Sequence, residues 1–150
     1  MPQSLASILV HLIFSTKNRQ PLITPEIEVE LYPYMASVFR ACDSPSLTGN
    51  GTADHVHRLF SLARTQTVAT VVEEVKQRSS KWLKSKGPNF AHFQWQAGYG
   101  AFSVGASMVP TVSAYIPGQK DHHQTTTFQD EFRSLLRRYG IDFDERYVWD

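Results

Sequence analysis

The sequence has one cysteine, no long apolar run and almost no net charge. A lone thiol, Cys42, excludes a disulfide within the chain and fits a reducing compartment such as the cytoplasm. No run of about 18 or more apolar residues occurs, so we expect no membrane span. The opening segment, MPQSLASILVHLIFSTKNRQ, lacks a basic n-region and a small-residue cleavage site. We therefore interpret it as a strand and not as a signal peptide.

The formal net charge of +1 gives no overall signal for nucleic-acid binding, but the charge is unevenly distributed. The segment 76–86 contains five basic residues and no acidic one, whereas the chain after Lys120 has seven acidic residues against four arginines. A basic segment of this kind either binds phosphates or forms the solvated face of a helix. The predicted phosphate-binding surface consists of Lys17, Arg19, Lys76, Lys81 and Lys84.

The 150 residues suit one domain with its own core, and no internal repeat or flexible linker divides them. Apolar patterning predicts strands near 8–14, 46–48, 55–62 and 93–104. Spacing and capping residues predict helices over 25–39, 67–84, 107–116 and 128–139, followed by a tail that docks as an extended arm. This order is that of a ferredoxin-like split βαβ fold. We therefore predict, for residues 1–150, an α+β domain with an antiparallel sheet of about four strands and extra C-terminal helices.

His55 and His57 flank a single valine in the predicted third strand. Residues i and i+2 of a strand point to the same face, about 7 Å apart at the backbone. Two neutral imidazoles in this arrangement can bind one divalent metal ion, or they can be hydrogen-bonded histidines at a sheet edge. A two-histidine metal site needs further ligands. Spacing does not choose among the polar candidates, which are His11, Asp54, Gln119, His122 and His123.

Five segments spread over most of the chain carry a resemblance to a known family. They are HLIFSTKNRQPLI, ADHVHRLFSL, WQAGYGAFSV, AYIPGQKDHH and GIDFDERYVWD, in this order. Together they resemble the HUH endonucleases, and more closely the single-tyrosine transposases of small bacterial insertion sequences and their repeat-associated relatives. The resemblance implies that single-stranded DNA is cut and rejoined near imperfect hairpins, through a tyrosine that becomes linked to the DNA 5′ end. It also implies a homodimer in which the tyrosine helix of one subunit can complete the site of the other.

Carried onto matching positions, the resemblance implies Tyr115 as the nucleophile and His55, His57 and Gln119 as ligands of Mg²⁺ or Mn²⁺. The residues alone do not single out Tyr115 among the six tyrosines. General chemistry is consistent with these roles, because a metal ion withdraws charge from a phosphate oxygen and a nearby cation favours the phenolate form of a tyrosine. A phosphotyrosine also preserves the energy of the phosphodiester, so the released 3′ hydroxyl can reverse the step on another strand.

Two positions depart from the family pattern. Pro117 and Gly118 lie between the tyrosine and the glutamine, and we expect a kink there to turn Gln119 away from the face of Tyr115. Arg58 follows the histidine pair where an apolar residue is common, and it should face away from both histidines. A catalytically weak or domesticated DNA-binding relative is therefore an alternative. Two others are a metal-dependent nuclease that uses water, and a non-catalytic nucleic-acid-binding module.

Overall fold

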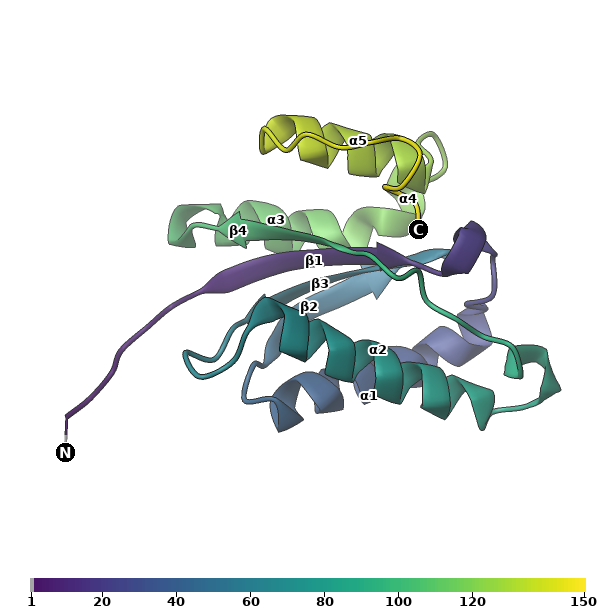
Figure 1. Ribbon diagram of the computed structural model, residues 1–150, viewed down its shortest axis with the longest axis horizontal. Helices are drawn as coiled ribbons and strands as arrows, with labels where there is room; N and C mark the ends of the chain where they lie inside the picture. The colour runs from purple at the N-terminus through teal and green to yellow at the C-terminus, as the bar shows by residue number, and fades with distance from the viewer. Residues whose placement is uncertain (1) are drawn as a thin grey trace.

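A four-stranded antiparallel sheet forms the middle layer of the computed structural model, which describes residues 2–150 (Figure 1). Its strands are β1 (Leu9–Ser15), β2 (Ser46–Gly51), β3 (His55–Ser61) and β4 (Gly100–Val104), in the order β2-β3-β1-β4. Helices α1 (Pro25–Ala41) and α2 (Val68–Lys84) cover one face, and α3 (Val109–Tyr115) and α5 (Phe128–Arg138) cover the other. This arrangement confirms the predicted α+β, ferredoxin-like class.

The central strands β1 and β3 are buried on both faces, and their alternation divides their side chains between two layers. Leu12 and Phe14 join the core beneath α1 and α2, whereas Ile13 packs with α5. The register pairs Ser15 with His55 and Ile13 with His57. Both histidines therefore lie on the face that α3 and α5 cover.

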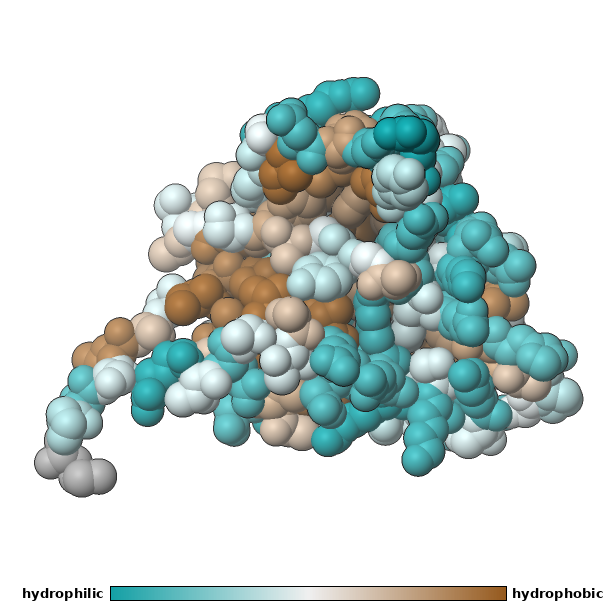
Figure 2. Space-filling view, viewed as in Figure 1, coloured by the Kyte–Doolittle hydropathy of each residue, from teal (hydrophilic) through white to brown (hydrophobic). Residues whose placement is uncertain are grey.

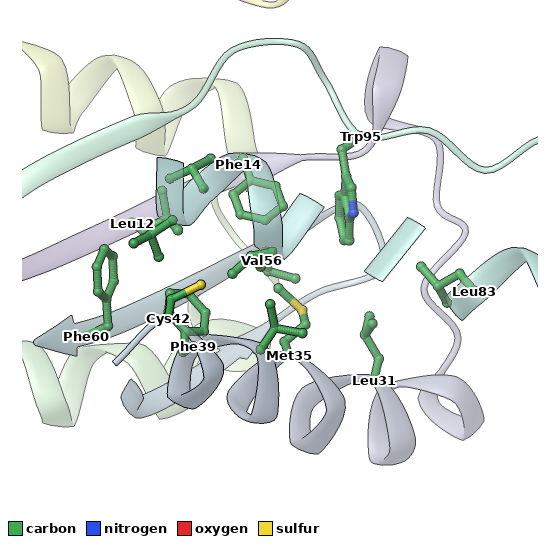
Figure 3. Close-up of a cluster of buried hydrophobic side chains, with 14 of the residues drawn as sticks. Leu12, Phe14, Leu31, Met35, Phe39, Cys42, Val56, Phe60, Leu83 and Trp95 are labelled. Atoms are coloured by element: carbon green, nitrogen blue, oxygen red, sulfur yellow. The ribbon is translucent and has the colours of Figure 1, made fainter. Parts of the chain in front are cut away.

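The larger core fills the space between the sheet and helices α1 and α2 (Figure 3). Leu31, Met35 and Phe39 recur along one side of α1 and are fully buried. The hydroxyls of Thr24 and Thr67 act as N-caps, since each accepts a hydrogen bond from the backbone N–H three residues on. Helix α1 continues past Pro33 without interruption.

Arg58 points into this same layer and away from the histidine pair, as its parity on β3 predicts. Its guanidinium donates to the Tyr32 carbonyl oxygen at 2.7 Å and lies over the Tyr32 ring. It also crosses Gly49, where a Cβ would lie 2.5 Å from the guanidinium carbon. Arg58 is therefore a buried structural residue and takes no part in the site.

The second layer carries the segment with the predicted nucleophile. After α3, the chain makes a 3₁₀ turn, η4 (Ile116–Gly118), and the short helix α4 (Gln119–His122) before α5 begins at the capping residue Thr127. Four apolar side chains of α5 pack on Ile13 of β1 and Phe102 of β4. At Gly100 a Cβ would lie 2.4 Å from the Phe132 ring, so this glycine allows α5 to approach the sheet closely.

The remaining elements are three short 3₁₀ turns, η1 (Lys17–Arg19), η2 (Pro88–Phe90) and η3 (Ala106–Met108). Strand β4 is shorter than predicted, because residues 93–99 form a loop whose β-type pairing is limited to an isolated bridge between Thr16 and Trp95. The tail docks as expected, but it contains turns and is not extended. Among residues 2–150, no helix combines the length and the apolar character that a membrane crossing needs.

Candidate active site

The side chains of His55 and His57 lie next to each other on β3, with ring centroids 5.2 Å apart and no exposed surface. Each ring is held by a hydrogen bond at Nδ1. For His55 the partner is the Asp54 carboxylate at 2.7 Å, and for His57 it is the His11 ring at 2.8 Å. Both Nε2 atoms therefore point at the same centre. Hydrogen bonds that hold a ring at its other nitrogen in this way are typical of histidines that bind metals. Asp54 and His11, two of the candidate ligands, hold the histidines in place.

The centre on which the histidines converge is a carboxylate oxygen of Glu131, from α5. Glu131 Oε1 lies 3.0 Å from Nε2 of His57, 3.0 Å from Nε2 of His123 and 3.5 Å from Nε2 of His55. One donor atom from each of these four residues lies within 4.8 Å of all the others. Three imidazoles and one carboxylate at this spacing fit a divalent metal ion.

The second oxygen of Glu131 faces the predicted nucleophile. Glu131 Oε2 accepts a hydrogen bond from the Tyr115 hydroxyl and lies 3.4 Å from Nε2 of His122. The Tyr115 ring is also 5.9 Å from the His57 ring, centroid to centroid. The structure therefore brings Tyr115 and both strand histidines together within one chain.

Gln119 lies at the same centre, contrary to the expectation that Pro117 and Gly118 would turn it away. The 3₁₀ turn at these residues continues directly into α4, and Asn50 fixes it by donating to the Pro117 carbonyl oxygen at 2.7 Å. Gln119 is fully buried, with Oε1 3.4 Å from Nε2 of His55. Its Nε2 has no hydrogen-bond partner among the described residues. The tightened turn has kept Gln119 on the side of Tyr115.

Burial determines the protonation states of His57 and His11. It lowers the pKa of His57 to about 4, which outweighs the opposing effect of Glu131, and it lowers the pKa of His11 to about 3. Burial alone would raise the pKa of Glu131, but hydrogen bonds from His123, His57 and Tyr115 hold it well below the usual range. At neutral pH the site therefore contains neutral His57 and an ionised carboxylate, which is the state that metal ions bind.

The pKa of Tyr115 is shifted in the opposite direction to that of Glu131. Burial raises it above its ordinary value, and the hydrogen bond to Glu131 and the negative charge of Glu131 raise it further. Gln119 has a smaller effect in the opposite direction. In this arrangement Tyr115 is a phenol at neutral pH, and a cation beside it would favour the phenolate.

A pocket of about 380 Å³ opens beside Tyr115, between β4, α3 and α5. Its wall combines apolar residues such as Val104 and Val112 with polar residues of the site, Tyr115 and Glu131. The exposed Arg138 lies at the same pocket. The pocket therefore gives a substrate a route to the phenolic oxygen, whereas His55 and His57 are fully buried beneath it.

The predicted DNA-binding residues lie in different parts of the molecule. Lys17 and Arg19 follow β1 at the end of the sheet where His55 begins β3. Lys81 and Lys84 are exposed on α2, in the layer on the other side of the sheet from Tyr115. Hydrophilic surface covers α2 in Figure 2, while apolar surface gathers between the α2 layer and α5.

Lys76 has a structural role, which differs from the DNA-binding role predicted for it. Its ammonium group donates to the carbonyl oxygens of Gln96 at 2.8 Å and Gly98 at 2.6 Å, and also lies over the Phe14 ring. These contacts fix the loop before β4 against α2. The lysine therefore has its donors occupied inside the protein and is not available to a phosphate.

Glu131 is the site residue that the sequence analysis missed. It lies three residues after Phe128 and four before Leu135, on the apolar stripe of α5. A carboxylate on such a stripe is a detectable signal, since ionised groups are rarely buried unless they are paired. The identity of its partners depends on how α5 packs across the sheet, which the sequence pattern does not give.

Comparison with known proteins identifies the family. Residues 4–119 match the family model described as "Transposase IS200 like". A candidate transposase from Deinococcus radiodurans is 20% identical with a TM-score of 0.62, and the match covers 79% of this chain and 98% of that one. A REP-associated tyrosine transposase bound to a REP hairpin is 14% identical with a TM-score of 0.60, over 82% and 72% of the two chains. No curated protein gives a significant match. Because the family model spans most of the chain, including Tyr115 and the histidine pair, the protein belongs to the IS200-like transposases.

Proposed function

We propose that this transposase cuts and rejoins single-stranded DNA at hairpin ends through a covalent link to Tyr115. The observation that carries the proposal is the convergence of the Tyr115 hydroxyl and both strand histidines on one buried carboxylate, that of Glu131. The structural similarity to a transposase bound to a REP hairpin supports hairpin DNA as the substrate class. The family and the His-x-His arrangement support a divalent metal ion, Mg²⁺ or Mn²⁺, held by His55, His57 and Gln119.

In the proposed step, the phenolic oxygen of Tyr115 forms a bond to phosphorus while the bond from phosphorus to O3′ breaks. The phenol loses its proton and the leaving O3′ oxygen gains one to become a hydroxyl, so the step is balanced and conserves one phosphodiester. A bound divalent metal supplies charge withdrawal at a non-bridging phosphate oxygen. Asp54 and His11 contribute by fixing the orientation of the two strand histidines.

The DNA strand would reach Tyr115 through the pocket beside it, where Arg138 can pair with a phosphate. In this proposal Lys17 and Arg19 would contact DNA close to the site. Lys81 and Lys84 would contact it only where the DNA passes around the sheet to α2. We further propose a homodimer that acts in the cytoplasm. Because one chain contains all the named groups, each subunit of such a dimer would have a site built from its own residues.

The test is a denaturing gel of the protein mixed with 3′-labelled single-stranded hairpin DNA and Mg²⁺ or Mn²⁺. We expect a slow-migrating, protease-sensitive adduct that is absent with Tyr115→Phe. Tyr139→Phe is the matched control, because Tyr139 lines the same pocket and donates to the Ser103 carbonyl oxygen, away from the histidines. Cleavage without an adduct in Tyr115→Phe would instead indicate a nuclease that uses water. Binding without cleavage by the unmodified protein would indicate a DNA-binding relative.

A further inference from the structure

We propose that Glu131 and His123 are metal ligands in addition to His55, His57 and Gln119, so that three imidazoles and a carboxylate bind the metal ion together with the Gln119 amide oxygen. This inference deepens the proposed function, since it rests on the same metal site at His55 and His57. It assigns a role in the site to α5 and to the loop before it, and it changes which metal ions the site should prefer.

The distances between donor atoms support this ligand set. Ligand atoms about 2.1 Å from a metal ion lie roughly 3.0 to 3.4 Å from one another at octahedral or tetrahedral angles. Glu131 Oε1 lies 3.0 Å, 3.0 Å and 3.5 Å from Nε2 of His57, His123 and His55. These separations match the edges of a coordination shell, and the four donors lie within 4.8 Å of one another.

The burial of the Glu131 carboxylate also favours a bound cation. Its residue is only 3% exposed, and its ion pairs within residues 2–150 are all with histidines. An ionised carboxylate in such a place is costly unless positive charge balances it. A divalent cation at the point where the histidines converge would balance the carboxylate charge.

The orientation of the three histidines supports the same ligand set. Like the two strand histidines, His123 is held at Nδ1, where the carbonyl oxygen of Thr126 lies at 2.5 Å. Its Nε2 is thereby directed at Glu131 Oε1. All three histidines therefore have Nδ1 engaged outside the centre and Nε2 turned toward it. This is the arrangement by which proteins orient imidazole ligands.

The ligand set predicts a preference among metals. Mg²⁺ prefers oxygen ligands and gives up its water reluctantly, whereas imidazole nitrogens bind later divalent transition metals more tightly. With three imidazoles and one carboxylate, we expect Mn²⁺ and Zn²⁺ to bind at least about tenfold more tightly than Mg²⁺.

Equilibrium dialysis of the full chain with MnCl₂ tests the assignment, with melting temperature as a second readout. We expect Glu131→Gln and His123→Gln each to weaken Mn²⁺ binding by at least about tenfold, the scale on which even outer partners of ligands act. Both should also lose most of the Mn²⁺-induced rise in melting temperature. Asp130→Asn is the control, because Asp130 is the neighbouring carboxylate, with a side chain 67% exposed and paired with Arg133. It should bind Mn²⁺ like the unmodified protein.

The outcomes separate this inference from the proposed function. If both variants bind Mn²⁺ normally while His55→Ala and His57→Ala do not, Glu131 and His123 are not ligands and the proposed metal site remains. If His55→Ala and His57→Ala also bind normally, both proposals are wrong. Should Glu131→Gln fail to fold, His123→Gln decides, since His123 is not fully buried and lies outside the regular helices. A purely structural role would lower the melting temperature without changing its response to Mn²⁺.

Discussion

Glu131 accepts a hydrogen bond from the hydroxyl of Tyr115, so the predicted nucleophile meets a carboxylate of the same chain. This contact raises the pKa of Tyr115 beyond what burial does, because a negative charge disfavours the phenolate. We therefore expect Glu131→Gln to lower the pKa of Tyr115 toward the ordinary value near 10. Ultraviolet pH titration checks this when each protein is compared with its Tyr115→Phe counterpart, so that the other tyrosines cancel. An unchanged difference curve would mean that the carboxylate charge has little effect on the phenol.

The metal-free protein should lose stability as the pH falls from about 6.5 toward 4. Burial lowers the pKa of His57 to about 4 and of His11 to about 3, so both stay neutral in the folded state while the unfolded chain takes up protons. The loss is roughly 1.4 kcal/mol per pH unit for each such group. Glu131, whose pKa is depressed, adds to the loss as the pH drops further through its range.

The contribution of His123 to stability changes with pH in the opposite direction. Burial alone would lower its pKa, but the hydrogen bond and charge of Glu131 raise it. The stability it contributes is therefore present below about pH 6.5 and is lost as the pH rises through its folded value. Thermal unfolding in EDTA between pH 4 and 8 should give a maximum near neutrality. His11→Gln should flatten the acid side, whereas His92→Gln, at an exposed position, should not.

The tyrosine segment should act within its own subunit. Asn50 of β2 donates to the Pro117 carbonyl oxygen at 2.7 Å, and Lys120 pairs with Glu28 of α1 at 2.9 Å. Both contacts fasten the segment after Tyr115 to the chain's own sheet and helix. We therefore expect an equal mixture of Tyr115→Phe and His57→Ala chains to form no DNA adduct on the denaturing gel. Adduct formation restored in the mixture, but in neither variant alone, would show that the segment is exchanged between subunits.

The close approach of α5 to the sheet should depend on Gly100. A Cβ at this position would lie 2.4 Å from the Phe132 ring and 3.0 Å from the Ile13 side chain. Gly100→Ala should therefore push α5 outward, cost about 1–3 kcal/mol of folding free energy, and weaken Mn²⁺ binding by displacing Glu131. Urea unfolding and dialysis measure the two effects. Gly105→Ala is the control, since a Cβ there meets nothing within 4 Å.

The fold could be predicted from the sequence because helix starts and strand faces depend mainly on residues close together in the chain. The capping residues Thr24 and Thr127 marked two helix starts, and alternation along β1 placed His11 on the opposite face from Leu12. The resemblance to transposases supplied Tyr115, which the patterns alone did not distinguish from the other tyrosines. Gln119 was expected to turn away, yet a 3₁₀ turn at Pro117 kept it beside His55, because proline is accommodated in a turn that lacks the regular helical hydrogen bond.

The contribution of α5 could not be predicted in the same way. Glu131 meets His57 only because α5 crosses the sheet at one height and angle, and these depend on how Phe132 packs at Gly100. Likewise, Lys76 looked like part of a basic surface, but the loop before β4 folded back over it and used its donors. Both cases involve contacts between segments distant in sequence, which periodicity does not encode.

The two halves of the site are made at different times during synthesis. Glu131 follows His57 by 74 residues in the chain. At about 5–20 residues per second, a ribosome needs about 4 to 15 s to add that length. For this interval the nascent protein has its paired imidazoles without the helix that later covers them. The histidines are therefore open to solvent and to dissolved ions before they become enclosed, and the enclosed state is reached only after Tyr115 has been added.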